Sequence, residues 1–128
     1  MAKGHRSQIK KERNAIKDTR PKAHAKYVRL SASKAKIVLD QIKGKDVKTA
    51  KAMLTYSPRY ASEVIFKVLK SAVANAENNL GMDVETLYVE EAVANKGPTM
   101  RRIRPRAKGS AYGILKQSSH ISIILNNR

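Results

Sequence analysis

The arginines and lysines between Ala94 and Gly113 are the residues of this chain whose types and spacing could do chemistry. Five cations lie close together within this segment, between residues 101 and 108, and no acidic residue lies among them. Arginine holds phosphate through paired N–H donors, and each such contact releases counterions from a nucleic acid. The pattern therefore predicts a surface for a phosphate backbone. The five cations are Arg101, Arg102, Arg104, Arg106 and Lys108.

This basic segment lies between two runs with the composition of β-strands, residues 86–93 and 119–125. The arrangement predicts a long β-hairpin over residues 94–118, with its tip near Pro105. Tight hairpins turn in two to five residues, so this connection is unusually long. It shows no apolar alternation that would predict a buried face. Because an isolated two-stranded ribbon is marginal in water, we expect either disorder or a partner with dense negative charge.

Composition points to the same class of partner. The chain has 128 residues and a net charge of +17, from 27 Lys and Arg against 10 Asp and Glu. Such self-repulsion favours binding to nucleic acid or to an anionic membrane surface. No apolar run approaches the ~20 residues of a transmembrane helix, and the basic segments lack the apolar face of a membrane-surface helix. Nucleic acid, and no membrane, is therefore the expected partner. The absence of Cys fits a reducing cytoplasm.

No pattern typical of a metal site or of catalysis is present. His5, His24 and His120 are scattered and lack the spacing of metal ligands. There is no nucleophile elbow and no glycine-rich phosphate loop. Glu90 and Glu91 could be drawn as an acid–base pair, but neighbours on a strand point to opposite faces, so we expect a solvated edge. We predict no metal, no cofactor and no enzymatic activity.

Residues 1–24 form a basic tail with little apolar content. Such a segment does not bury enough apolar surface to offset the entropy of ordering, so we expect it to be disordered when free. Because most of its charges have one sign, we also expect it to order on phosphate. The tail residues expected to contact RNA are Lys10, Lys11, Arg13, Arg20 and Lys22.

We predict a single domain over residues 25–128. Residues 25–30 have the composition of a short strand. Ser31 or Ser33 then caps a helix that carries one apolar stripe and ends at Gly44. Asp46 is then expected to cap the next, shorter helix.

Two more helices complete the predicted core. The first covers residues 47–54, and the second begins with Ser57 as its cap and Pro58 as its first residue. Tyr60 and Phe66 are assigned to the core, so no aromatic platform for stacking bases is expected. The prediction is an α+β fold, with a three-stranded antiparallel sheet packed on three helices and a long protruding basic β-hairpin.

Four segments in collinear order carry a resemblance to a known family. They are residues 97–109, the basic helix at 34–45, residues 71–79 and the ending at 118–123. Together they resemble the bacterial large-subunit ribosomal protein L twenty-two family, over roughly residues 25–128. Many bacterial members begin near this chain's Ala25, so the basic tail departs from the shorter pattern.

The resemblance implies a constituent of the large ribosomal subunit in the cytoplasm. It implies binding to large-subunit ribosomal RNA, support of its assembly, contacts with neighbouring ribosomal proteins, and a hairpin that lines the polypeptide exit tunnel. Nascent polypeptide and macrolide antibiotics would then lie near the hairpin. The residues expected to bind ribosomal RNA are Arg29, Lys34, Lys36, Lys43, Lys45, Lys96, Arg101, Arg102, Arg104, Arg106, Lys108 and Lys116. The residues expected at the tunnel-lining tip are Met100, Arg101, Arg102, Ile103, Arg104, Pro105 and Arg106.

Two other classes of protein compete with this interpretation. An architectural DNA-binding protein also uses a basic β-ribbon arm with a proline at the tip. An enzyme that acts on RNA would need a cluster of carboxylates or histidines beside the basic surface, and none is seen. Salt-dependent binding does not separate a ribosomal protein from a DNA-binding protein. Co-sedimentation with large ribosomal subunits after a high-salt wash does separate them.

Overall fold

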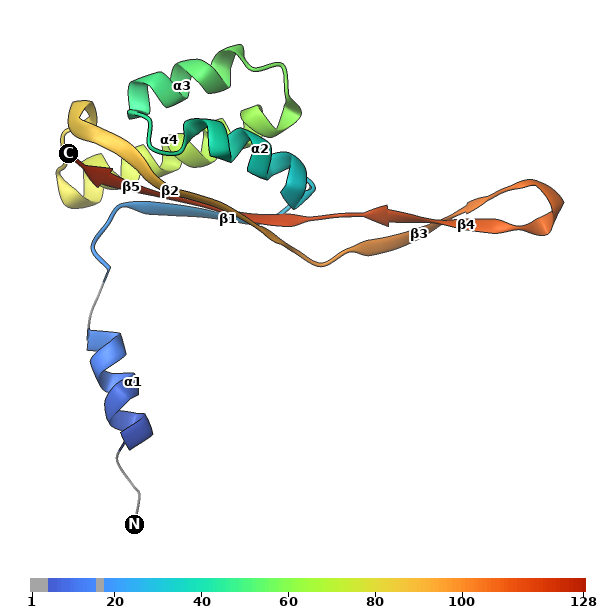
Figure 1. The fold of residues 1–128 in the computed structure, drawn as a ribbon, viewed down its shortest axis with the longest axis horizontal. Coiled ribbons are helices and arrows are strands. Elements are labelled where there is room, and N and C mark those ends of the chain that lie inside the picture. Colours follow the sequence, from blue (N-terminus) through green and yellow to red (C-terminus); the bar gives the residue numbers. More distant parts are fainter. Residues whose placement is uncertain (1–4, 16–17) are drawn as a thin grey trace.

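The computed structural model describes residues 5–15 and 18–128 of the chain. Figure 1 shows a globular part, a long two-stranded projection and a separate helix near the N-terminus. The helices and strands of the described residues are α1 (His5–Ala15), β1 (Lys22–Val28), α2 (Ala32–Ile42), α3 (Val47–Tyr56), α4 (Tyr60–Leu80), β2 (Leu87–Lys96), β3 (Met100–Pro105), β4 (Ala111–Lys116) and β5 (Ser119–Asn127), with 3-10 turns η1 (Val84–Thr86) and η2 (Ala107–Gly109).

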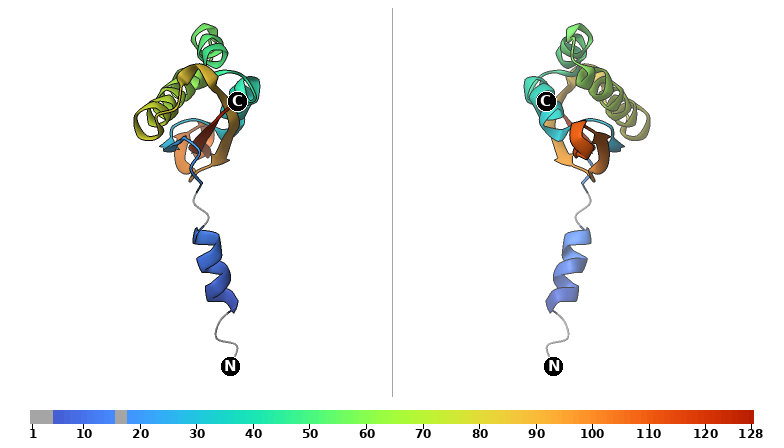
Figure 2. Two further views of the ribbon diagram at one scale, coloured as in Figure 1. Left: turned by 90° about the vertical axis from the view of Figure 1, so that its left-hand side faces the viewer. Right: turned by 90° about the vertical axis from the view of Figure 1, so that its right-hand side faces the viewer.

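The core lies between one sheet and three helices. The strands are ordered β1-β5-β2, and both neighbouring pairs are antiparallel. Ile121, Ile123 and Leu125 of the central strand β5 are fully buried, as their alternation predicts. Helices α2, α3 and α4 cover one side of this sheet, which the end-on views of Figure 2 also show. The predicted α+β fold with a three-stranded antiparallel sheet is confirmed.

The first two core helices follow the sequence pattern closely. The apolar stripe of α2 is buried, and its C-terminal turn is closed by Gly44 at a φ of 76°, a left-handed conformation that favours glycine. Asp46 precedes α3, as predicted. The apolar side of α3 buries Val47, Ala50 and Leu54 against the same core. No helix among the described residues is long and apolar enough to cross a membrane.

The start of α4 differs from the prediction. Ser57 and Pro58 do not begin the helix; Arg59 is its N-cap and Tyr60 its first residue. Ser57 ends α3 in an extended conformation and accepts a 2.8 Å hydrogen bond from the Ser62 hydroxyl. The chain needs these residues to reverse between two packed helices, so tertiary packing overrides the local capping signal. Tyr60 is consequently 64% exposed and does not belong to the core.

The N-terminal region is more regular than the sequence predicts. Strand β1 begins at Lys22 and ends at Val28, because it pairs with β5 from Lys22↔Ile124 onward. Residues 5–15 form helix α1, although no element was predicted there. Most residues of α1 have good intrinsic helix propensity. Its side chains from residue 7 to residue 15 are exposed, so α1 buries no apolar face of its own.

Strands β3 and β4 form a separate two-stranded sheet that projects from the globular part (Figure 1). They pair from Met100↔Lys116 to Pro105↔Ala111. We call residues 100–116 the arm. Lys108 and Gly109 turn the chain with φ values of 58° and 67°, so the tip lies at η2 and not at Pro105.

Gly97, Pro98 and Ser118 connect the arm to the main sheet, and we call them the root. The Gly97 N–H donates to the Ser118 carbonyl at 2.8 Å, and the Ser118 hydroxyl donates to the Pro98 carbonyl at 2.6 Å. A Cβ atom on residue 97 would lie 2.6 Å from the Ser118 Oγ. Only glycine permits this approach, so the root fixes how the two chain segments enter the arm.

Candidate nucleic-acid interface

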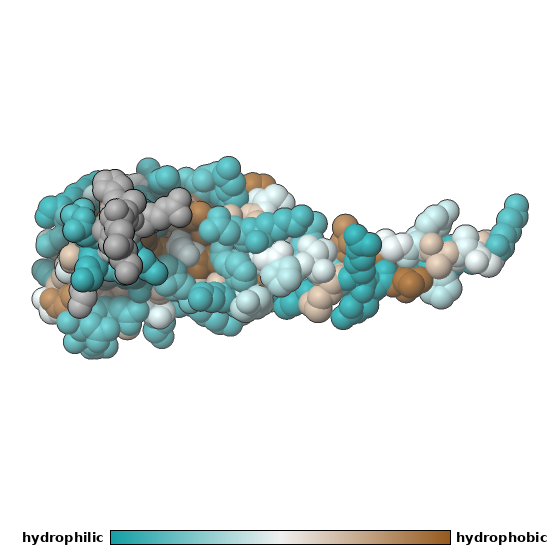
Figure 3. Space-filling model, turned by 90° about the horizontal axis from the view of Figure 1, so that it is seen from below, coloured by the Kyte–Doolittle hydropathy of each residue, from teal (hydrophilic) through white to brown (hydrophobic). Residues whose placement is uncertain are grey.

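The arm has two chemically different faces. Directly paired residues of antiparallel strands point to the same side of a sheet. The pairing therefore places Arg102, Arg104 and Lys116 on one face. The opposite face carries Ile103 and Leu115, which are 74% and 58% exposed. Figure 3 shows hydrophilic and hydrophobic residues side by side along the projection.

The prediction that the hairpin has no buried apolar face is confirmed, because no residue of β3 or β4 is buried. Neither strand alternates clearly by itself, because Arg101 shares the apolar face and Met100 and Ile114 share the basic one. The apolar side is assembled from both strands, and only their register reveals it. The arm is therefore a ribbon with a mainly basic side and a mainly apolar side.

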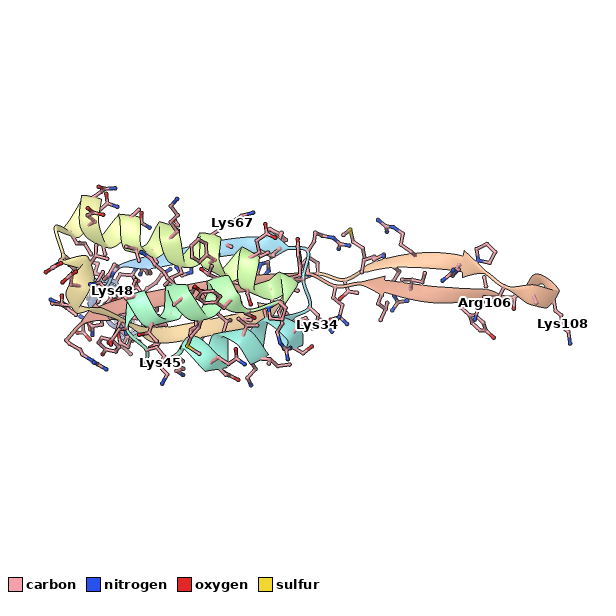
Figure 4. All side chains as sticks on the ribbon, turned by 90° about the horizontal axis from the view of Figure 1, so that it is seen from above. Lys34, Lys45, Lys48, Lys67, Arg106 and Lys108 are labelled. Carbon is pink, nitrogen blue, oxygen red and sulfur yellow. The ribbon has the colours of Figure 1, made fainter. Side chains whose placement is uncertain are left out.

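The tip carries two further cations. The Arg106 guanidinium carbon lies 5.4 Å from the centroid of the Tyr112 ring, a cation–π contact that keeps the charge beside the ribbon. Lys108 lies at the end of the arm, beyond Arg106 (Figure 4). Of the residues predicted at the tip, Met100 lies at the base of the arm and pairs with Lys116. Residues 100–105 thus form the whole of one strand, and only Arg106 adjoins the turn.

Helix α2 and the turn after it supply a second set of basic side chains. Lys34, Lys36, Lys43 and Lys45 are all exposed, off the buried stripe of the helix. Figure 4 shows Lys34 at the end of the domain nearest the arm and Lys45 towards the other end. The turn is held in place because its backbone forms hydrogen bonds with Val89 of β2 in both directions.

Three more predicted cations meet where the arm leaves the domain. Lys96 is the last residue of β2, and Lys116 is the last residue of β4. The Arg29 Nη1 donates a 3.4 Å hydrogen bond to the Lys116 carbonyl. All three residues are exposed. The structure therefore brings together the root end of the arm and the residue just after β1, which are far apart in sequence.

Arg20 lies in a cluster of carboxylates. It contacts Asp18 at 2.9 Å, Glu90 at 3.0 Å and Glu91 at 3.5 Å, and we call these four residues the Arg20 cluster. Hydrogen bonds from the Arg20 side chain and backbone lower the pKa of Asp18 to about 2. Hydrogen bonds to Asp18 and then Glu90 raise the pKa of Arg20.

The Arg20 cluster also corrects the expected geometry of the two glutamates. A break in the register between Val89 and Glu91 leaves Glu90 in a β-bulge. The bulge shifts the in–out alternation by one residue, so both carboxylates reach the same guanidinium instead of pointing to opposite faces. The neighbouring Lys22 also approaches Asp18, at 3.8 Å. Lys10, Lys11 and Arg13 lie on α1 and are exposed.

Among the residues that the structure describes, carboxylates pair with cations on the globular part and on the segment directly before it. Lys48 pairs with Glu85, which raises the pKa of the lysine through a side-chain hydrogen bond. Arg128 lies 3.1 Å from Asp46. Within the described part of the chain, none of the six cations of the arm is paired with a carboxylate. The described residues also contain no group of three or more side chains suited to a metal ion.

Known proteins share this sequence over nearly its full length. The family model described as ribosomal protein L22p/L17e matches residues 23–126. The large ribosomal subunit protein uL22 of Lachnoclostridium phytofermentans is 64% identical over 128 residues, the whole of both chains. The protein of the same name from Lachnospira eligens is 62% identical over the same length.

A third relative matches a shorter stretch of the chain. The uL22 protein of Clostridium novyi is 53% identical over 107 residues, which are 84% of this chain and 96% of that protein. Helix α1 precedes the first residue that the family model matches. Strands β1 to β5, helices α2 to α4 and the arm all lie within or directly at the matched region. The chain therefore belongs to the ribosomal protein L22p/L17e family.

Proposed function

We propose that this protein is a structural constituent of the large ribosomal subunit in the cytoplasm and binds large-subunit ribosomal RNA. The observation that carries the proposal is the arm, whose six cations have no carboxylate partner among the described residues. Two relatives that match the chain over its whole length are named large ribosomal subunit proteins. A dense polyanion would neutralise the arm and stabilise an otherwise marginal ribbon.

The arm's basic face and the exposed lysines of α2 are the proposed RNA contacts. Arg29, Lys96 and Lys116 would extend this surface around the root. Lys10, Lys11, Arg13 and Lys22 are proposed as secondary contacts from the tail. Arg20 is not among them, because it already has three carboxylate partners. Binding at both the domain and the arm would join separate parts of the RNA and so support assembly.

We further propose that the arm lines the polypeptide exit tunnel. The two-faced ribbon suits such a place, since its basic face can contact RNA while Ile103 and Leu115 face a passage for nascent polypeptide. Macrolide antibiotics would then bind near the arm, and neighbouring ribosomal proteins would contact the globular part. The family assignment gives no support to the alternative of an architectural DNA-binding protein, nor to an enzyme.

The test is retention on ribosomes. A variant with Arg101, Arg102, Arg104 and Arg106 replaced by Gln is compared with one in which Lys26, Lys48, Lys67 and Lys70 are replaced. Both variants lose four positive charges, but only the first loses them from the arm. After a high-salt wash, the control should still co-sediment with large subunits and the arm variant should be depleted. Equal retention of both variants would contradict the proposed role of the arm, and failure of the unaltered protein to co-sediment would contradict the function itself.

A further inference from the structure

Tyr60 is a large aromatic residue that the fold leaves outside the core. It is the first residue of α4 and is 64% exposed. Its side chain borders three hollows of the surface: one of 420 Å³ whose lining includes Glu63, and two of 530 and 500 Å³ whose charged lining residues are all basic. Packing in the core does not explain a tyrosine here, since both Tyr60 and the N-cap residue Arg59 before it are exposed.

The larger hollow lies where the domain meets the arm, and we call it the Tyr60 groove. Its lining includes Arg29, Lys34, Tyr60, Leu115 and Lys116. These residues come from the loop after β1, from α2, from α4 and from β4, so only the folded chain assembles them. Its volume lies within the ~300–1,000 Å³ typical of ligand sites.

Charge in the Tyr60 groove is of one sign. Three cationic side chains line it, and neither it nor the 500 Å³ hollow beside it includes an acidic residue in its lining. The second hollow adds Arg59 on the other side of Tyr60. The Arg29 guanidinium is oriented by its hydrogen bond to the Lys116 carbonyl, which leaves its other N–H groups for a ligand. The complementary ligand is therefore anionic.

We propose that the Tyr60 groove binds one unpaired nucleotide of RNA, with its base stacked on the Tyr60 ring and its phosphate held by Arg29, Lys34 and Lys116. An exposed aromatic ring beside cations is the combination that proteins use for unstacked bases. A regular duplex offers no free base face, so the groove selects a bulged or looped nucleotide. This inference rests on the proposed function, because it refines how the chain would bind RNA.

The sequence offers a direct reporter of stacking. The chain contains no Trp, so Tyr60→Trp in the full-length protein introduces a single indole at the groove. Tyr56→Trp is the matched control, since Tyr56 is 87% exposed and is not among the residues that line the groove. The probes are a short single-stranded oligoadenylate, an RNA duplex of equal length, and polyglutamate as an anion without bases.

Oligoadenylate should quench the indole fluorescence of the Tyr60→Trp protein, whereas the duplex and polyglutamate should not. The Tyr56→Trp protein should show little quenching by any probe. Affinity for oligoadenylate, measured by anisotropy, should fall about tenfold in Tyr60→Ala and stay within about twofold in Tyr60→Phe. Replacing Arg29 and Lys34 by Gln should weaken binding further without abolishing the quenching at saturation.

The possible failures are distinguishable. Equal quenching by polyglutamate would identify a general anion site and overturn the stacking proposal. Oligoadenylate binding without selective quenching at residue 60 would also overturn it, while leaving the proposed RNA-binding function intact. If the unaltered protein bound neither RNA probe, the proposed function itself would be contradicted.

Discussion

The direction of the arm should depend on the absence of a side chain at Gly97. In Gly97→Ala, the new Cβ would lie 2.6 Å from the Ser118 Oγ and 3.2 Å from the backbone carbon and oxygen of Ser118. The hydroxyl does not move away freely, because it donates a 2.6 Å hydrogen bond to the Pro98 carbonyl. We therefore expect the two segments at the root to separate and the arm to rotate.

The structure gives the size of this movement. Ordinary contact begins at 3.4 Å, so the hydroxyl contact must open by about 0.8 Å. Across a strand spacing of ~4.8 Å, this opening corresponds to a rotation of ~10°. The arm from residue 100 to residue 107 is ~23 Å long at ~3.3 Å per residue, so its tip should move by ~4 Å. In Gly97→Ala combined with Ser118→Ala, only the backbone contacts remain, and the movement should fall to ~1 Å.

The measurement is a distance between two spin labels. The chain has no Cys, so cysteines introduced at Lys108 and Lys67 are the only attachment sites. Gly113→Ala is the matched control, because a Cβ at that position in the arm meets nothing within 4 Å. The mean distance should change in Gly97→Ala, change less in the double variant and stay unchanged in Gly113→Ala. An unchanged mean in Gly97→Ala, with both proteins folded, would refute the idea that the root sets the direction of the arm.

Three further predictions address charge and length. Because Arg20 lowers the pKa of Asp18 from 3.8 to about 2, the pair stabilises the fold above pH 3.8 and loses this contribution as the pH falls through about 2. Arg20→Met should therefore flatten the pH dependence of thermal unfolding between these values, and an unaltered profile would contradict this role. Replacing the four arginines of residues 101–106 by Gln should reduce the salt slope of RNA binding by roughly 3, at ~0.7–0.9 per lost phosphate contact; an unchanged slope would place these side chains away from phosphate. Deleting Met100, Arg101 and Arg102 removes an odd number of residues from β3 and so reverses its alternation against β4. The globular fold and subunit assembly should survive while the tip is displaced, and a ribosome structure with macrolide susceptibility of the strain would test this.

Local periodicity was enough to predict most of the core. The alternation of Ile121, Ile123 and Leu125 and the stripe of α2 each lie within one element, and burial follows directly from spacing. Features that depend on distant pairing were not predicted. The β-bulge at Glu90 arises from the register with β5, and the apolar face of the arm exists only once β3 and β4 are aligned.

In the candidate site, too, local features were predictable from the sequence and features that depend on distant contacts were not. The exposure of the arginines and lysines follows from charge alone, and their types predict phosphate binding. The sequence does not predict which cations form ion pairs within the protein. Arg20 is an example, because its partners Glu90 and Glu91 lie some seventy residues away. Tyr60 was wrongly assigned to the core, because the buried side of α4 begins at Ala61 and leaves Tyr60 exposed. The sequence therefore did not predict that Tyr60 is exposed near the start of the arm.

The distribution of carboxylates explains how one chain can carry so much positive charge and still fold. Asp18, Glu90 and Glu91 pair with Arg20, while Glu63 and Glu85 pair with Lys67 and Lys48. No acidic residue follows Glu91 in the sequence, so the arm and the final strand have no acidic residue of their own. Repulsion is consequently relieved where the core must hold together and left unrelieved where the chain projects. A polyanion that neutralises the arm would therefore stabilise a region whose cations have no carboxylate partner among the described residues.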